Sequence, residues 1–128
     1  MNASVSAASR LGFAALNFDC ADPAALAQFW GRVLGRPVSP GAVAGDVAVD
    51  VTDPAAGPRL IFHPAAQPEV VKNMLRPILI TKQYEAELER LTGLGATVLG
   101  EIELPAARVT TFADPAGNDF DLVTWQSE

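Results

Sequence analysis

The sequence predicts an α+β fold in which two βαβββ modules pair into a curved mixed sheet with a concave pocket. Two observations lead to this prediction: short motifs repeat along the chain at one offset, and both halves show the same order of strand and helix patterns. Gly35 and Gly95 end matching Leu-Gly pairs and lie 60 residues apart, as do Gly57 and Gly117, which end matching Asp-Pro-Ala turns. Matches that share one offset and one order indicate an internal duplication.

The first half begins with a strand followed by a helix. Residues 13–19 are strand-like, with Ala14, Leu16 and Phe18 on one face and Asn17 and Asp19 on the other, which is the period of a half-buried strand. Asp22 and Pro23 supply a helix N-cap and a first-turn proline, and Gly35 supplies a stop. Between these signals, apolar side chains recur at helical spacing, at Leu26, Phe29, Trp30, Val33 and Leu34. We expect Trp30 to belong to the core.

The second half repeats this order. Residues 75–80 are predicted as its first strand, Thr81 as the helix cap and Gly95 as the stop. The apolar stripe of this helix consists of Tyr84, Leu88 and Leu91. Three short strands follow each helix: near Val38 and at 46–51 and 59–63 in the first half, and near Val98 and at 108–112 and 120–125 in the second. Asn118 is expected to shape the turn before the last strand.

Length and composition bound the domain organisation and the compartment. The 128 residues, 49% hydrophobic and 19% charged, suit one globular domain. Residues 1–10 are predicted to be a flexible tail without the apolar segment of a signal peptide. Residues 11–128 form the domain, with module one at about 11–66 and module two at about 72–126. Cys20 is the only cysteine, so no internal disulfide is available, and we expect an inert thiol in a cytoplasmic protein.

Charge and hydropathy patterns exclude two classes of partner. The net charge is −6 and the nine lysines and arginines are scattered, which argues against nucleic-acid binding. No apolar run approaches the roughly 18 residues of a membrane span. Neither a nucleophile elbow nor a phosphate-binding glycine loop is present.

Several motifs resemble those of a known family. They are Asp22-Pro23, Phe29-Trp30, Leu34-Gly35, Leu60-Ile61-Phe62, Lys72-Asn73, Leu94-Gly95-Ala96-Thr97 and Asp114-Pro115-Ala116-Gly117-Asn118. In them the chain resembles, over about residues 11–125, the glyoxalase/bleomycin resistance/dioxygenase (vicinal oxygen chelate) superfamily, and within it the glyoxalase-like subgroup. The resemblance implies paired βαβββ modules, frequent homodimers and a pocket in each paired sheet. Enzymes of the family chelate a divalent metal with one residue from each of four strands, whereas other members bind a drug or metabolite without metal.

The four metal positions implied by the resemblance are occupied here by Ala15, Ile61, Arg76 and Asp121. Only the last could coordinate a cation, and an arginine would repel one. Divalent metals need three or four converging donors at about 2 Å. His63 lies two residues beyond Ile61 and would be a second ligand at best. The sequence therefore predicts neither a metal nor another cofactor.

A mostly apolar pocket with a few polar groups is expected on the sheet face opposite the helices. Its predicted ligand-binding residues are Asn17, His63, Met74, Arg76, Asp121 and Trp125.

Four of these residues are open to two interpretations. Arg76 and Asp121 either form a structural ion pair or leave the guanidinium to hold a ligand anion. His63 is either a rim residue or a ligand contact and weak candidate for a general base, since histidine changes its charge near neutral pH. Trp125 is either a stacking wall or a dimer contact. Lys72-Asn73 receives no role beyond the link between modules.

Three functions are therefore compared. The first is a metal-independent binding protein of the glyoxalase/bleomycin resistance type that holds a small organic molecule, anionic or aromatic, in the sheet pocket. The second is a lyase, isomerase or dioxygenase of the same fold that uses a divalent metal or His63 as base. The third is a dimeric interaction module without a ligand. A homodimer is expected, and the modules pair either within one chain or across two.

Overall fold

The computed structural model describes residues 13–41, 44–51, 57–65 and 75–125, and of Trp125 it describes only the backbone. Four predicted features lie outside the described residues: the tail at 1–10, the first Asp-Pro-Ala turn, Lys72-Asn73 and Met74. The helices and strands of the described residues form an α+β protein, as the sequence predicts.

Both halves contain the predicted order of one strand, one helix and three strands. Module one consists of β1 (Ala15–Cys20), α1 (Pro23–Leu34), β2 (Val38–Pro40), β3 (Val47–Val49) and β4 (Arg59–Pro64). Module two consists of β5 (Ile78–Ile80), α2 (Tyr84–Leu94), β6 (Thr97–Leu104), β7 (Ala107–Ala113) and β8 (Asp119–Trp125). The sheets have the equivalent strand orders β1-β4-β3-β2 and β5-β8-β7-β6. In each, the first and last strands of the module pair in parallel and the other pairs are antiparallel.

The first helix follows its local signals closely, whereas the second departs from them. The Asp22 carboxylate accepts the N–H of Ala25, and Gly35 ends α1 with a φ of 66°. The predicted cap Thr81 is wrong, because α2 is capped at Gln83. The Thr81 hydroxyl instead accepts the backbone N–H of Gln83 at 2.9 Å and so forms a turn before the helix.

The strand β5 is shorter than the predicted strand over residues 75–80. Pro77 has no amide hydrogen to donate, so the regular ladder begins at Ile78. The Pro77 carbonyl still accepts the N–H of Asp121 at 2.9 Å, which keeps the preceding segment beside β8.

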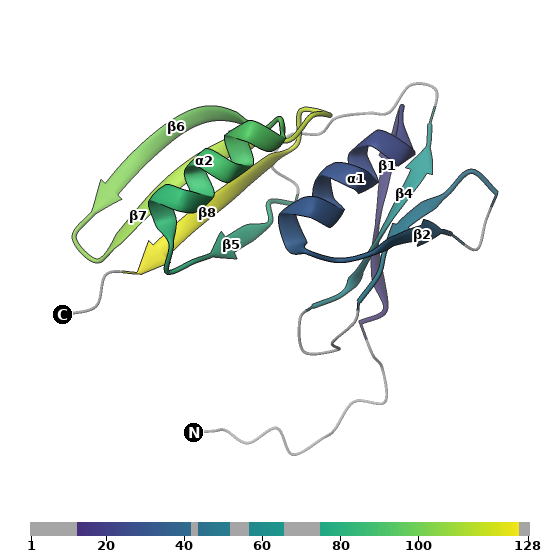
Figure 1. Cartoon of the computed structure of the whole chain (residues 1–128), viewed down its shortest axis with the longest axis horizontal. Coiled ribbons are helices and arrows are strands. Elements are labelled where there is room, and N and C mark those ends of the chain that lie inside the picture. Colours follow the sequence, from purple (N-terminus) through teal and green to yellow (C-terminus); the bar gives the residue numbers. More distant parts are fainter. Residues whose placement is uncertain (1–12, 42–43, 52–56, 66–74, 126–128) are drawn as a thin grey trace, which may run out of the picture.

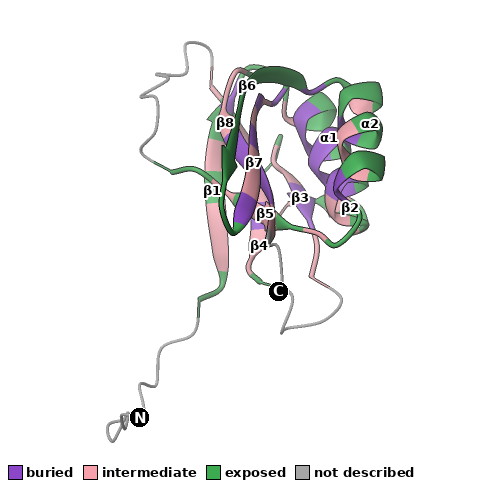
Figure 2. Ribbon diagram, turned by 90° about the vertical axis from the view of Figure 1, so that its left-hand side faces the viewer, coloured by how far each residue is buried: buried purple, intermediate pink, exposed green. Residues whose placement is uncertain are grey.

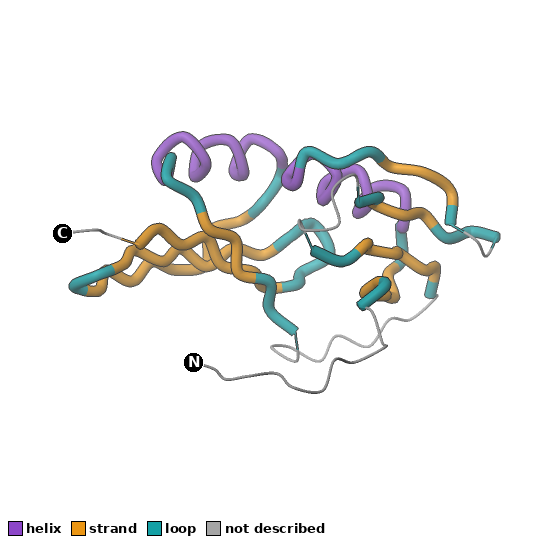
Figure 3. The backbone as a smooth tube through the Cα atoms, turned by 90° about the horizontal axis from the view of Figure 1, so that it is seen from below, coloured by secondary structure: helices purple, strands orange, loops and turns teal. Residues whose placement is uncertain are grey.

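The molecule has two layers. The two modules lie side by side along the long axis (Figure 1). Both helices lie on the same side of the sheets, as Figures 2 and 3 show from two directions. Among the described residues, no helix covers the opposite faces of the two sheets, which are called the helix-free faces. Neither α1 nor α2, the helices of the described residues, has the length and apolar character needed to cross a membrane.

One hydrophobic core joins the modules. The rings of Phe29 and Trp30 on α1 pack against Phe120 of module two at centroid distances of 6.2 and 4.9 Å. Phe120 in turn stacks on Phe112 of β7 at 5.3 Å. Trp30 is buried, as predicted from its place on the apolar stripe. Side chains of both modules therefore contribute to one core.

A buried hydrogen-bond network connects α1 to the turn before β8. The Trp30 indole Nε1–H donates to Asp114 Oδ2 at 3.0 Å. Asp114 Oδ1 accepts the backbone N–H groups of Ala116 and Asn118, both at 2.9 Å. The Asn118 side-chain amide also donates to Asp114, which confirms that this asparagine shapes the turn.

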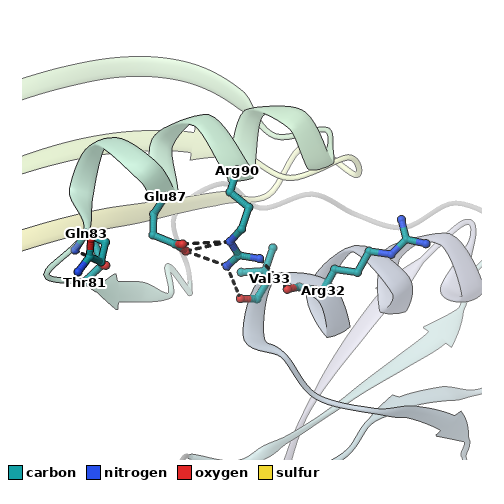
Figure 4. A network of polar contacts seen from close by, with 6 residues as sticks. All are labelled: Arg32, Val33, Thr81, Gln83, Glu87 and Arg90. Atoms are coloured by element: carbon teal, nitrogen blue, oxygen red, sulfur yellow. Dashed lines mark hydrogen bonds and ion pairs between the residues drawn. The ribbon is translucent and has the colours of Figure 1, made fainter.

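Arg90 makes a second connection between the modules (Figure 4). From α2 its guanidinium donates to the carbonyls of Arg32 and Val33, at 2.9 and 3.0 Å. These carbonyls belong to the last turn of α1, where helices have unsatisfied acceptors and a partial negative charge. Glu87 holds the guanidinium in place with an Oε1–Nη2 distance of 2.7 Å. The hydrogen bond from Arg90 lowers the pKa of Glu87, and the same contact raises the pKa of Arg90.

The Glu87–Arg90 pair predicts a pH-dependent contribution to stability. Because the pKa of Glu87 is lower in the folded protein, the contribution is complete above the ordinary glutamate pKa of about 4.3. It disappears as the pH falls through the lowered value. We expect Glu87→Gln to reduce the free energy of unfolding by less than about 1 kcal/mol at neutral pH, since the pair is partly exposed.

Urea unfolding of both proteins between pH 3 and 7 measures this difference. The gap between wild type and Glu87→Gln should close in acid. Glu89→Gln, which changes an exposed glutamate of the same helix, controls for the loss of one charge. A gap that stays constant down to pH 3 would contradict the assignment.

Candidate functional site

The helix-free face of module two contains a polar cluster around Asp121. Arg76 Nη1 donates to Asp121 Oδ2 at 3.4 Å, and Arg76 Nη2 lies 3.8 Å from Asp119 Oδ2. The Thr111 hydroxyl donates to Asp121 Oδ1 at 2.7 Å. The Arg76 side chain is 36% exposed and that of Asp121 is 11% exposed. Of the two interpretations of Arg76 and Asp121, the ion pair is therefore present, and both carboxylate oxygens of Asp121 have donors.

Cross-strand register explains why these side chains meet. Asp121 lies opposite Ile78 of β5 on one side and Thr111 of β7 on the other. Residues opposite one another in a ladder point to the same face of the sheet. Sequence analysis missed Thr111, although pairing β7 antiparallel to β8 would have placed it beside Asp121. Asp119 was missed as a partner of Arg76 because this contact depends on the parallel register of β5 and β8.

An apolar band lies next to this cluster on the same face. This apolar band consists of Ile80, Val123, Val109 and Ile102, which are register partners across all four strands of the sheet. Val123 is buried, whereas Ile80, Ile102 and neighbouring Ile78 are exposed large hydrophobic residues. Polar groups beside apolar surface are typical of small-molecule sites.

Module one presents a second polar set on its helix-free face. His63 Nδ1 lies 2.7 Å from Asp46 Oδ1. Asp19, the register partner of His63 on β1, accepts a hydrogen bond from the Asn17 side-chain amide at 3.2 Å. Asp46 was predicted only as the start of a strand. Its position opposite His63 follows from the β3–β4 register, in which Val47 pairs with Phe62.

A third polar pair lies at the other end of β3. Arg59 Nε donates to Asp50 Oδ1 at 3.0 Å. The pKa of Asp50 is lowered, chiefly by a hydrogen bond from Ser39 and also by Arg59, against the opposing effect of burial. This pair therefore lies at one end of β3. At the other end, Asp46 is the carboxylate in contact with His63.

The structure thus divides the predicted site residues into two sets. Arg76 and Asp121 are in contact in module two, whereas Asn17 and His63 share the helix-free face of module one. Met74 lies outside the described residues, and Trp125 is placed only as the last residue of β8.

Two apolar cavities lie at the junction of the modules, on the side of the helices. One of about 360 Å³ is bounded by the end of α1, by β5 and by α2, and includes Leu34, Leu79 and Leu91. The other, of about 190 Å³, lies between β1, β4 and β5 and also includes Leu34 and Leu79. Sequence analysis did not predict them, because they depend on how the modules pack.

The residues at the four family metal positions do not fit a metal ion. Ala15 and Ile61 offer no donor atoms, and the guanidinium of Arg76 points at the carboxylate of Asp121. A cation would have to displace Arg76 and Thr111 from that single carboxylate, and divalent ions need three or four donors. Within the part of the chain that the structure describes, no group of three or more His, Cys, Asp and Glu side chains could hold a metal ion.

Cys20 is buried at the end of β1. Burial raises the pKa of its thiol, which lowers the thiolate fraction available for reaction. The position suits the predicted inert cysteine.

Comparisons with known proteins agree on the family. A model of the glyoxalase-like domain matches residues 15–123. No curated protein matches the chain in sequence. A glyoxalase/bleomycin resistance protein/dioxygenase family enzyme from Burkholderia phytofirmans PsJN superposes with a TM-score of 0.71 at 14% identity, over 90% of this chain and 99% of that one.

Two further solved structures share the fold. A glyoxalase/bleomycin resistance protein/dioxygenase from Nocardioides superposes with a TM-score of 0.63 at 20% identity, over 95% of this chain and 88% of that one. TnmS3, an antibiotic binding protein from Streptomyces, superposes with a TM-score of 0.64 at 19% identity, over 93% of this chain and all of that one. With both modules inside the matched range, the chain belongs to the glyoxalase-like domain family.

Proposed function

We propose that the protein is a metal-independent binding protein for a small organic molecule, held on the helix-free face of the sheets. The observation that carries this proposal is the cluster at the family metal position. There, Arg76 and Thr111 already bind the one carboxylate, Asp121, that could ligate a cation. At the position that binds metal in enzymes of the family, this chain thus presents a polar surface for contact with a ligand.

The chemistry of the face supports an aromatic or otherwise largely apolar ligand. The apolar band offers isoleucine and valine side chains beside the Asp121 cluster. Two carboxylates, Asp119 and Asp121, lie near the Arg76 guanidinium, so its charge is compensated and an anion gains less from it. Asn17 and His63 would orient the ligand from module one, and Met74 and Trp125 would add apolar contacts. TnmS3, which shares the fold, is an antibiotic binding protein.

A homodimer is part of this proposal. Ile78, Ile80 and Ile102 are exposed on the open face, and a second copy packed there would bury them and enclose the ligand. Such a protein would work in the cytoplasm, in keeping with a single buried cysteine.

Of the enzyme alternatives, the metal-dependent one requires donors that the four family positions do not supply. The alternative with His63 as base has one specific contact in its favour, the hydrogen bond to Asp46. The third function, an interaction module without a ligand, is distinguished from the first by a binding screen.

A thermal-shift screen of small organic molecules against the protein in EDTA tests the proposal. A ligand at 100 times its Kd should stabilise the fold by about 2.7 kcal/mol. We expect Arg76→Gln and Thr111→Val to weaken binding of the hits by roughly 1–3 kcal/mol each. Each substitution removes one hydrogen-bond donor from the Asp121 carboxylate and so disturbs the surface that would contact the ligand.

The matched control is Arg108→Gln. Arg108 lies on β7 like Thr111 but contacts Glu85 and the ring of Tyr84 on the helix side, so the hits should keep their affinity. A screen without hits, or hits that bind only when a divalent metal is restored, would overturn the proposal.

A further inference from the structure

Asp46 and His63 have the arrangement of an oriented imidazole. The Asp46 side chain is 8% exposed and that of His63 is 43% exposed, so the carboxylate is the more buried partner. The contact joins Nδ1 to Asp46 Oδ1 at 2.7 Å, a length typical of a charge-assisted hydrogen bond. Because an ionised carboxylate can only accept, Nδ1 is the nitrogen that donates to it, and in the neutral form of the ring the lone pair is then on Nε2.

The position of Asp46 is fixed by the segment before β3. The Gly41 N–H donates to the Asp46 carbonyl at 2.9 Å. A Cβ atom on Gly41 would lie 2.5 Å from the Cβ of Asp46, so only glycine allows this close packing. Gly45 adopts a φ of 92° directly before the aspartate. A carboxylate held by its backbone in this way can keep the imidazole in one orientation.

We propose that His63 accepts a proton through Nε2 from a molecule bound on the helix-free face, and that Asp46 is its positioning residue. This inference rests on the proposed function, because it gives the ligand of that face a defined contact. The Asp46 carboxylate fixes the tautomer that makes Nε2 the acceptor and stabilises the imidazolium formed by the transfer.

The surrounding charges indicate the class of molecule. Asp46 contacts the ring and Asp19 is the register partner of His63 on β1, so a ligand that arrives as an anion is disfavoured, whereas the imidazolium formed by proton transfer is favoured. The inferred partner of Nε2 is a neutral, weakly acidic O–H group such as a phenol, and the imidazolium compensates the charge left on its oxygen. In the transfer the ligand O–H bond breaks, its electron pair stays on oxygen, and the proton forms the new N–H bond at Nε2. No oxidant, metal or co-reactant takes part.

The dyad is tested first in the ligand-free protein, where His63 is the only histidine. Nitrogen-15 NMR of the imidazole should show the neutral ring with its hydrogen on Nδ1. Acylation by diethyl pyrocarbonate should occur at Nε2. In Asp46→Asn we expect the tautomer to become mixed and acylation to slow by about tenfold, since hydrogen bonds to charged groups are the strong ones.

Asp50→Asn is the matched control. It removes the same charge from the other end of β3, where the carboxylate binds Arg59, and should leave tautomer and acylation rate unchanged. Wild-type protein with the hydrogen on Nε2, or equal effects of the two substitutions, would overturn the role of Asp46.

The acceptor role is tested with 4-nitrophenol, at a pH where the free probe is largely protonated. Binding to wild type should produce the absorbance of the phenolate, and His63→Gln should abolish this band. A bound probe that stays protonated, a band that survives His63→Gln, or no binding up to millimolar probe overturns the proton transfer. Binding of other screen hits alongside such a result would leave the proposed binding function standing, so the two failures are distinguishable.

Discussion

Asp114→Ala is expected to lower the free energy of unfolding by about 3–5 kcal/mol, because it leaves several buried donors unsatisfied. The Asp114 residue is 4% exposed. Its carboxylate accepts hydrogen bonds from two backbone amides, from the Asn118 side chain and from the Trp30 indole. Removing it leaves these donors without their acceptor, at a cost of roughly 1–3 kcal/mol for each that stays dry. Equilibrium unfolding in urea measures the loss.

The matched control for this substitution is Asp22→Ala. Asp22 also accepts a backbone N–H, that of Ala25, but it is exposed and makes one such bond, so we expect a loss of about 1 kcal/mol. Trp30→Phe should fall between the two, since it removes a single donor from the network. If Asp114→Ala costs no more than Asp22→Ala, the turn does not depend on its buried carboxylate.

Phe120→Ala is expected to destabilise the protein by about 3–5 kcal/mol and to do so for both modules at once. The Phe120 ring is fully buried and contacts Phe112 in its own module and Phe29 and Trp30 in the other. The core is thus shared, and its loss cannot be confined to module two. Unfolding followed by near-UV and far-UV circular dichroism should remain a single transition with a lower midpoint.

Phe18→Ala serves as the comparison. Phe18 is partly buried and stacks on Phe62 within module one at 5.1 Å, so its removal should cost less. Two separate transitions in Phe120→Ala, one of them at the wild-type midpoint, would show that the modules fold independently.

Much of the fold could be predicted because its signals are local. The Asp22 cap, Pro23 and Gly35 lie within one helix length of each other and set the bounds of α1. The repeat provided the rest, since equivalent motifs in the two halves predict equivalent elements. The local signal at Thr81 was misleading, because its hydroxyl accepts the backbone N–H of Gln83 in the turn before α2.

The candidate site was harder to predict because it depends on strand register. Arg76 and Asp121 could be placed together because both occupy metal positions that the family resemblance implies. Thr111 and Asp46 were missed, since their partners lie on neighbouring strands and their contacts emerge only once the register between those strands is assigned. The junction cavities beside Leu34 and Leu79 were beyond reach, because they arise where two modules pack.

The most direct test of metal-free binding on the helix-free face is an amide chemical-shift map of the protein with a screen hit in EDTA. The account predicts saturable shifts in β1, β4, β5 and β8 around Asn17, His63 and Asp121. Shifts confined to the residues of the helix-side cavities around Leu34 and Leu79, or shifts that appear only after a divalent metal is added, would contradict it.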